Sequence, residues 1–196
     1  MKKVAIIDYG VGNIKSIINA VSSLRCTVLF TSSQKEISSS DAIILPGVGA
    51  YKEGMSNLID RGLDTTIKEY SQTGRPVLGI CLGMQLLLEN SHEFGFTQGL
   101  GLIKGSVERL PSFPSLAIPH IGWEEVSFSD GLVIEDFFFC HSFYASPTDR
   151  GTILGTTLFG DYSFCSVVKK DNITGFQFHP EKSGEAGLNL LEKFVL

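Results

Sequence analysis

The sequence has few cysteines, and their spacing excludes a disulfide-rich scaffold. The four, Cys26, Cys81, Cys140 and Cys165, are widely separated and form no Cys-x-x-Cys pair. Small secreted domains that depend on disulfides carry many more. We therefore expect a protein of the reducing cytoplasm, whose cysteines are by default small buried hydrophobes.

The sequence also lacks long apolar runs and basic blocks. No stretch approaches the ~18 apolar residues of a membrane span, and the apolar run at residues 4–7 ends at Asp8, too early for a signal peptide. The formal net charge is −5, with no cluster of Lys and Arg. We therefore expect neither a membrane nor a nucleic acid as partner.

The first half of the chain alternates short apolar runs with helical periodicity. Continuous apolar runs are typical of buried parallel strands, and alternation with helices predicts right-handed crossovers with helices on both sheet faces. The predicted strands are residues 4–8, 26–30, 42–45 and 76–80; the predicted helices cover residues 14–24, residues 55–70 with an interruption near Gly62, and a segment after Cys81 through Leu88.

In the second half, strand signals follow one another closely, which predicts an antiparallel extension of the sheet. These strands are residues 103–110, 123–128, 133–143, 152–158, 164–169 and 173–178, and an amphipathic helix follows at residues 188–195. Because the 196 residues show no repeat and no linker, we expect a single α/β domain with a mostly parallel central sheet.

A candidate nucleophile stands in Gly79-Ile80-Cys81-Leu82-Gly83, which has the form of a nucleophile elbow. In this motif a sharp strand-to-helix turn holds the central residue in a strained conformation between small neighbours. The helix N-terminus favours a thiolate and can hold an oxyanion. The motif alone fits a buried cysteine in an ordinary turn equally well, but a strand before it and a helix after it favour the nucleophile.

A candidate base and its orienting acid stand near the end of the chain. His179 and Glu181 flank Pro180, and in extended chain they would leave on one face. With Cys81 they complete a nucleophile–base–acid set. An exposed His-Pro-Glu turn is the alternative. A zinc site is weaker, because the histidines lie far apart without short ligand spacing.

A third glycine-rich segment, Pro46-Gly47-Val48-Gly49, follows the strand at residues 42–45 and faces the same sheet edge. It lacks the Lys-Ser/Thr pair of a phosphate-binding P-loop. Glycines allow a peptide plane to flip, so an N–H near Val48 could join that of Leu82 in an oxyanion hole. The alternative is an ordinary turn.

Together these three motifs resemble the class I (triad) glutamine amidotransferases. The resemblance implies a flavodoxin-like fold, a glutamine amidotransferase type 1 domain over residues 1–196, and no metal or cofactor. It also implies that Cys81 attacks the carboxamide of L-glutamine, that His179 transfers the proton, and that Glu181 holds His179. The oxyanion hole would be formed by Gly47, Val48, Gly49 and Leu82.

Further stretches, residues 8–13, 99–103, 119–123 and 180–185, resemble the family's glutaminase subunits of histidine biosynthesis. The resemblance implies a heterodimer with a separate (β/α)8-barrel cyclase that receives the ammonia. It assigns glutamine binding to Gln85, Glu93, Ser142 and Phe143, and the partner interface to Asn13, Trp123 and Lys182. The alternatives are a polar helix-face residue for Gln85, a solvated acid for Glu93, a core side chain for Trp123 and an exposed lysine for Lys182.

Two departures from the family pattern concern the partner. Glu124 stands where the family usually has Asn, and residues 137–139 are all Phe where the family commonly shows a Tyr. They leave open a related glutaminase that supplies ammonia to a sugar-amidating synthase for surface polysaccharide. A scaffold without turnover is disfavoured by the intact Cys81, His179 and Glu181, and a Cys peptidase by the glycine-rich segment and the His-Pro-Glu sequence.

Overall fold

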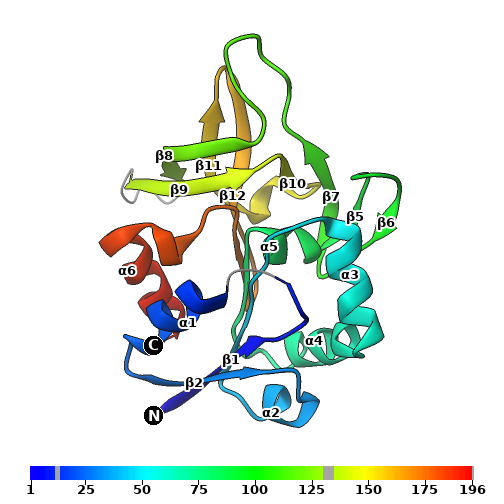
Figure 1. Cartoon of the computed structure of the whole chain (residues 1–196), viewed down its shortest axis with the longest axis vertical. Coiled ribbons are helices and arrows are strands. Elements are labelled where there is room, and N and C mark those ends of the chain that lie inside the picture. Colours follow the sequence, from blue (N-terminus) through cyan, green and yellow to red (C-terminus); the bar gives the residue numbers. More distant parts are fainter. Residues whose placement is uncertain (12–13, 130–134, 196) are drawn as a thin grey trace.

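A mixed sheet of thirteen strands organises the computed structural model, which describes residues 1–11, 14–129 and 135–195 (Figure 1). Five parallel strands form its centre in the order β2-β1-β3-β4-β13. They are β2 Cys26–Thr31, β1 Lys2–Ile7, β3 Ala42–Leu45, β4 Val77–Ile80 and β13 Ile173–Phe176. Parallel order places their carboxyl ends at one edge, where doubly wound folds place their ligands.

Helices cover both faces of this parallel region. The helices are α1 Ile14–Ser22, α2 Gln34–Ser38, α3 Tyr51–Asp60, α4 Leu63–Ser71, α5 Leu82–Leu86 and α6 Gly184–Val195. Ile43 and Leu45 of β3 belong to the core cluster with α3 and α4, whereas Ile44 packs in the cluster with α1 and α6. Successive strand residues point to opposite faces, so a strand buried on both is continuously apolar. The predicted α/β class is confirmed.

The second half forms the antiparallel extension. Its strands are β12 Tyr162–Lys170, β10 Phe143–Pro147, β7 Ile103–Arg109, β5 Leu88–Ser91, β6 Thr97–Gln98, β11 Ile153–Phe159, β8 His120–Phe128 and β9 Glu135–His141. From β13 the sheet continues through β12, β10, β7, β5 and β6, of which β5 and β7 pair in parallel. β11, β8 and β9 branch from β12. Two short 3₁₀ helices, η1 Arg150–Thr152 and η2 Pro180–Lys182, complete the fold.

Three segments differ from the sequence expectation. The strand predicted over residues 133–143 is two strands in the described part, because β9 pairs with β8 while β10 pairs with β7 and β12. The helix predicted through Leu88 ends at Leu86, and Leu88 begins β5. A buried Leu run fits either state. The helix α2 and the short strands β5 and β6 were not predicted.

The four cysteines are free, and their burial differs. Cys81 and Cys165 are buried and Cys26 is partly buried, but Cys140 is exposed, so the default expectation of burial is wrong for Cys140. Its strand alternates, with Phe137 and Phe139 facing the core. Within residues 1–11, 14–129 and 135–195, no helix has the length and apolar character needed to cross a membrane.

Candidate active site

Cys81 occupies a strained turn between β4 and α5, at the carboxyl edge of the sheet. Its φ and ψ are 52° and −109°, a left-handed region that L residues rarely adopt. Strain of this kind costs on the order of 1–3 kcal/mol and persists only where the surroundings impose it. Its N–H donates to the carbonyl of Phe176 at 2.7 Å, and its own carbonyl accepts from the Gln85 N–H at 3.2 Å.

The two glycines of the motif are sterically required. A Cβ at Gly83 would lie 1.8 Å from the carbonyl oxygen of Leu45, and one at Gly79 would lie 2.7 Å from the backbone of Gly83. Both obstacles are backbone atoms, which cannot rotate away as a flexible side chain can. The crowding that the motif predicts is therefore present around Cys81.

His179 and Glu181 lie close together through a turn rather than in extended chain. Pro180 begins η2, so Glu181 reaches back to the ring, and its Oε1 is 2.9 Å from Nδ1 of His179. The expectation of an extended spacing was wrong in form, although the pair it predicted is formed. Both side chains are nearly fully buried.

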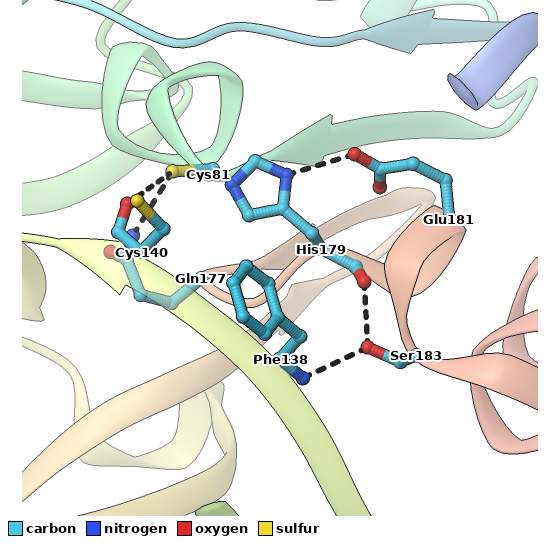
Figure 2. Close-up of polar contacts among 7 residues, drawn as sticks. All are labelled: Cys81, Phe138, Cys140, Gln177, His179, Glu181 and Ser183. Carbon is cyan, nitrogen blue, oxygen red and sulfur yellow. Dashed lines mark hydrogen bonds and ion pairs between the residues drawn. The ribbon is translucent and has the colours of Figure 1, made fainter. Parts of the chain in front are cut away.

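The backbone of His179 is fixed from β9. Its N–H donates to the carbonyl of Phe138 at 2.9 Å. The hydroxyl of Ser183 donates to the His179 carbonyl at 2.6 Å and accepts from the Phe138 N–H at 3.0 Å (Figure 2). This small network joins the turn at η2 to the strand that carries Cys140.

The ring of His179 lies between Cys81 and Glu181 (Figure 2). Nε2 has no hydrogen-bond partner in the described part of the chain. Sγ of Cys81 is directed to the carbonyl oxygen of Cys140 at 3.9 Å. Burial opposes a charge on the imidazole, but Cys81 and Glu181 together outweigh it and raise the pKa of His179 to about 10. The imidazolium is therefore favoured beside the sulfur.

The oxyanion hole expected at Gly47, Val48, Gly49 and Leu82 is not open in this structure. The Leu82 N–H donates to the carbonyl oxygen of Gly47 at 3.3 Å. The hydroxyl of Tyr9 donates to the carbonyl of Pro46 at 2.5 Å and anchors the same segment. The Leu82 N–H, which an oxyanion would need as a donor, is thus already hydrogen-bonded to the Gly47 carbonyl. Turning the peptide that joins Gly47 to Val48 would replace this carbonyl with an N–H.

A cavity of about 780 Å³ opens beside Cys81 and can hold an amino acid. It brings together the residues predicted to bind glutamine, and it is lined by Gln85, Glu93, Ser142 and Phe143 among others. Nε2 of Gln85 donates to the carbonyl of Phe143 at 2.8 Å. Oε2 of Glu93 accepts from the Tyr51 N–H at 2.7 Å, at the start of α3, so Glu93 is tied to the protein and not simply solvated.

Gln177 is a further residue of the site, and none of the sequence motifs includes it. This fully buried residue accepts a hydrogen bond from Gln85 at 3.1 Å and lies 3.7 Å from the sulfur of Cys81. A periodic signal could have found it, because Gln177 stands two residues before His179 and shares its face in extended chain. Phe176 and Phe178 stack on each other with centroids 5.1 Å apart.

His120 and His141 form a pair that the sequence did not predict. They lie opposite each other on the paired strands β8 and β9. His120 Nδ1 lies 3.3 Å from His141 Nε2, and His141 Nδ1 lies 2.8 Å from the carbonyl of Phe143. Burial, with smaller effects of His120 and His179, lowers the pKa of His141 to about 3. The residues described contain no cluster of His, Cys, Asp or Glu suited to a metal.

The residues predicted for the partner interface lie partly in the described region. Trp123 is 54% exposed, so the alternative of a core tryptophan is wrong. It packs edge-on against Phe138, over whose ring Lys182 places its Nζ at 5.5 Å. Glu124, which stands beside Trp123 where the family usually has Asn, places its Oε1 3.2 Å from Nε2 of His120. Asn13 lies outside the described residues.

Comparisons with known proteins identify the family of the chain. The family model of class-I glutamine amidotransferases matches residues 5–196. A relative from Listeria monocytogenes serotype 4a, named imidazole glycerol phosphate synthase subunit HisH, is 45% identical over 97% of this chain and 94% of its own length. One from Legionella pneumophila strain Lens, named imidazole glycerol phosphate synthase subunit HisH 1, is 42% identical over 100% and 99%.

Solved structures show the same fold at low sequence identity. A crystal structure of a glutamine amidotransferase has a TM-score of 0.76 at 17% identity, and the match covers 98% of each chain. A structure of PurLQS from Thermotoga maritima has a TM-score of 0.77 at 16% identity, covering 100% of this chain and 98% of that chain.

Proposed function

The chain belongs to the class I glutamine amidotransferase family, and we propose that it is the glutaminase subunit of an imidazole glycerol phosphate synthase. It hydrolyses L-glutamine to glutamate and ammonia. The ammonia passes to a separate (β/α)8-barrel cyclase, which forms imidazole glycerol phosphate and AICAR in histidine biosynthesis. One glutamine amidotransferase domain, residues 1–196, works in the cytoplasm with neither metal nor cofactor.

The observation that carries the chemistry is the position of His179: Nδ1 lies on Glu181, and Nε2, beside Cys81, has no hydrogen-bond partner within the described part of the chain. The thiol proton of Cys81 passes to Nε2 of His179, which forms the thiolate–imidazolium pair that the raised pKa of His179 favours. Sγ of Cys81 then attacks the carboxamide carbon of glutamine. The carbonyl oxygen takes up the negative charge. The carbon–nitrogen bond then breaks as His179 returns the proton, releasing ammonia and leaving a glutamyl thioester on Cys81.

Water completes the cycle. It attacks the thioester carbonyl while His179 accepts one of its protons. Collapse of the second tetrahedral intermediate releases glutamate and the sulfur of Cys81, which recovers its proton from His179. Throughout, Glu181 accepts a hydrogen bond from the protonated Nδ1 of His179, so Nδ1 keeps its proton and Nε2 is the atom that exchanges protons.

Both tetrahedral intermediates need the oxyanion hole, which is closed in the structure of the chain alone by the Leu82–Gly47 hydrogen bond. We infer that binding of the loaded cyclase favours the turned 47–48 peptide. Gly49 adopts a φ of 119° and a Cβ there would meet no atom within 4 Å, so the segment has room to rearrange. Ammonia release would then be confined to the complex that can use it.

Glutamine fits the cavity by its three polar ends. Its carboxamide meets Cys81, its ammonium group approaches Gln85 and Glu93, and its carboxylate meets the backbone at Ser142 and Phe143. The exposed Trp123 packs on the partly buried Phe138, and Lys182 lies above the Phe138 ring. This group supports a docking surface near η2, because aromatic side chains are enriched at interfaces. Asn13 belongs to the same proposed interface.

The test is Cys81→Ala in the complex with the cyclase. Synthesis from glutamine should be abolished, while synthesis from added ammonium salt should remain. Cys26→Ala, a partly buried cysteine at the start of β2, is the matched control and should keep both activities. Loss of the ammonia-driven reaction in Cys81→Ala would mean that the residue is structural.

The identity of the partner separates the histidine pathway from sugar amidation. The untagged partner should co-purify as a (β/α)8-barrel cyclase, and its nucleotide ligand should raise glutaminase activity strongly over that of the lone chain. A sugar-modifying synthase recovered instead would assign the surface-polysaccharide pathway. Full activity of the lone chain would contradict control through the interface.

A further inference from the structure

Gln177 is a buried amide at the nucleophile that the reaction above leaves without a role. It follows β13 at the carboxyl edge of the sheet and has no exposed surface. Its Nε2 lies 3.7 Å from Sγ of Cys81, and its Oε1 lies 3.1 Å from Nε2 of Gln85 (Figure 2 shows the contact with Cys81). A fully buried amide needs partners for both ends, and these are the partners it has.

The orientation of the two amides follows from the carbonyl of Phe143. A carbonyl only accepts, so the atom of Gln85 that lies 2.8 Å from it is the NH₂ group. This same NH₂ faces Gln177, which must therefore present its oxygen. The remaining end of Gln177, directed at the sulfur, is then an NH₂ group. The backbone of β10 thus determines, through two side chains, that Cys81 meets a donor.

The other polar neighbour of the sulfur has the opposite character. The carbonyl oxygen of Cys140, 3.9 Å from Sγ, can accept a hydrogen bond from the thiol but cannot donate one to a thiolate. Gln177 donates, and a donor stabilises the charged form more than the neutral one. Together the two groups contact the sulfur where it lines the cavity, near Nε2 of His179, which has no hydrogen-bond partner among the described residues.

We propose that Gln177 is a positioning residue that donates a hydrogen bond to the sulfur of Cys81, stabilising its thiolate and linking it through Gln85 to the glutamine pocket. The proposal rests on the proposed function. Because both N–H groups of Gln85 are used by Phe143 and Gln177, its Oε1 is the atom left to accept from the ammonium group of glutamine. The same chain of amides therefore orients the nucleophile and a substrate contact.

The test compares Gln177→Glu and Gln177→Met with the wild-type chain. Glu keeps the acceptor for Gln85 but turns an oxygen toward the sulfur, whereas Met keeps the volume and removes the donor. The rate of iodoacetamide alkylation of Cys81 is measured against pH by peptide mass, with the exposed Cys140 of the same chain as internal control. In the cyclase complex, kcat and KM for glutamine are measured together with ammonia-driven synthesis.

We expect the half-maximal pH of Cys81 alkylation to rise by roughly one unit or more in Gln177→Glu, and to rise less in Gln177→Met. Cys140 should be unchanged. In the complex, kcat with glutamine should fall about tenfold or more, while synthesis from ammonia remains. An unchanged alkylation profile of Cys81 in both variants would overturn the proposal even if kcat fell, because the role would then be structural.

The wild-type complex separates this inference from the function on which it rests. If wild type shows no glutaminase activity with its partner, the proposed function fails. If wild type is active and both Gln177 variants match it in kcat and in the alkylation profile, only the role of Gln177 fails. Thermal unfolding of both variants identifies one whose activity is lost through misfolding, and Gln177→Met, which keeps the core volume, is expected to remain folded.

Discussion

The backbone N–H of Leu82 donates to the carbonyl oxygen of Gly47 at 3.3 Å. Leu82 follows the nucleophile directly, so its N–H can donate to the charge that develops on a carboxamide attacked by Cys81. While this hydrogen bond is in place the oxyanion hole is closed, which prevents the lone subunit from releasing ammonia where nothing can use it. The stability of the closed arrangement depends on what holds the segment at residues 46–49 in place.

Tyr9 is one such anchor, because its buried hydroxyl donates to the Pro46 carbonyl. Tyr9→Phe should weaken the closed arrangement and raise the glutaminase activity of the lone chain several-fold. Leaving the carbonyl unpaired should also lower the free energy of unfolding by about 1–3 kcal/mol. Steady-state glutamate release and chemical denaturation measure the two effects.

Tyr51→Phe is the matched control for this change. The hydroxyl of Tyr51 is also buried, but it has no hydrogen-bond partner among the described residues. Its removal should leave both the lone-chain activity and the stability close to wild type. Equal activation by the two substitutions would mean that the Tyr9–Pro46 hydrogen bond does not hold residues 46–49 in the closed arrangement.

Glu181→Gln should move the alkaline limb of the pH–activity profile to lower pH. Burial opposes the charge on His179, and Cys81 and Glu181 overcome it to raise the pKa of His179 to about 10. Removing the carboxylate lowers the pKa of His179, so the imidazolium that protonates the leaving ammonia is lost earlier as pH rises. A shift of one unit corresponds to about 1.4 kcal/mol.

The measurement is kcat/KM for glutamine between pH 6 and 10.5 in the cyclase complex. The free energy of unfolding should change with pH in the same direction. The pKa of His179 is raised in the folded state, so His179 stabilises the fold at low pH, and this contribution is lost as pH rises toward the folded pKa. The stability difference between wild type and Glu181→Gln should therefore shrink from pH 6 to pH 10. An alkaline limb at higher pH in Glu181→Gln than in wild type would refute the pairing of Glu181 with His179.

Gly83→Ala should prevent a stable fold. The added Cβ would lie 1.8 Å from the Leu45 carbonyl oxygen, a backbone atom of the central strand β3. We expect a loss of more than about 3 kcal/mol, seen as insoluble expression or a large fall in Tm. Gly122→Ala, whose Cβ would meet nothing within 4 Å, should be stable. A Gly83→Ala protein of normal Tm would contradict the packing of the elbow.

Trp123→Ala should weaken association with the cyclase without unfolding the chain. The side chain is 54% exposed and packs edge-on against Phe138. Exposed aromatics at interface centres often contribute 2 kcal/mol or more, so Kd should rise about thirtyfold or more. Ile59→Ala, an equally exposed apolar side chain on α3, is the control and should leave Kd unchanged. The measurement is calorimetric titration.

The parallel strands were the most predictable part of the fold. Residues 42–45 are continuously apolar because β3 is buried on both faces, and this requirement is written into four consecutive positions. The run at residues 86–88 was misread for the same reason: a helix end and a buried strand both demand Leu there. The division at Ser142 between β9 and β10 depends on pairing with three other strands, which no local pattern records.

The sequence by itself determined the elements around Cys81, because a strand, a strained turn and a Gly79 crowded by the backbone of Gly83 are local requirements of one short segment. The crowding at Gly83 comes instead from Leu45 of β3 and belongs to the tertiary structure. The sequence also indicated His179 and Glu181, two positions apart. Only the tertiary structure decided that His120 meets His141, that Gln177 lies between Gln85 and the sulfur, and that Gly47 blocks the Leu82 donor. These contacts join residues 21 to 96 positions apart, and a hydrogen bond between distant residues depends on how whole elements pack, which no short stretch of sequence encodes.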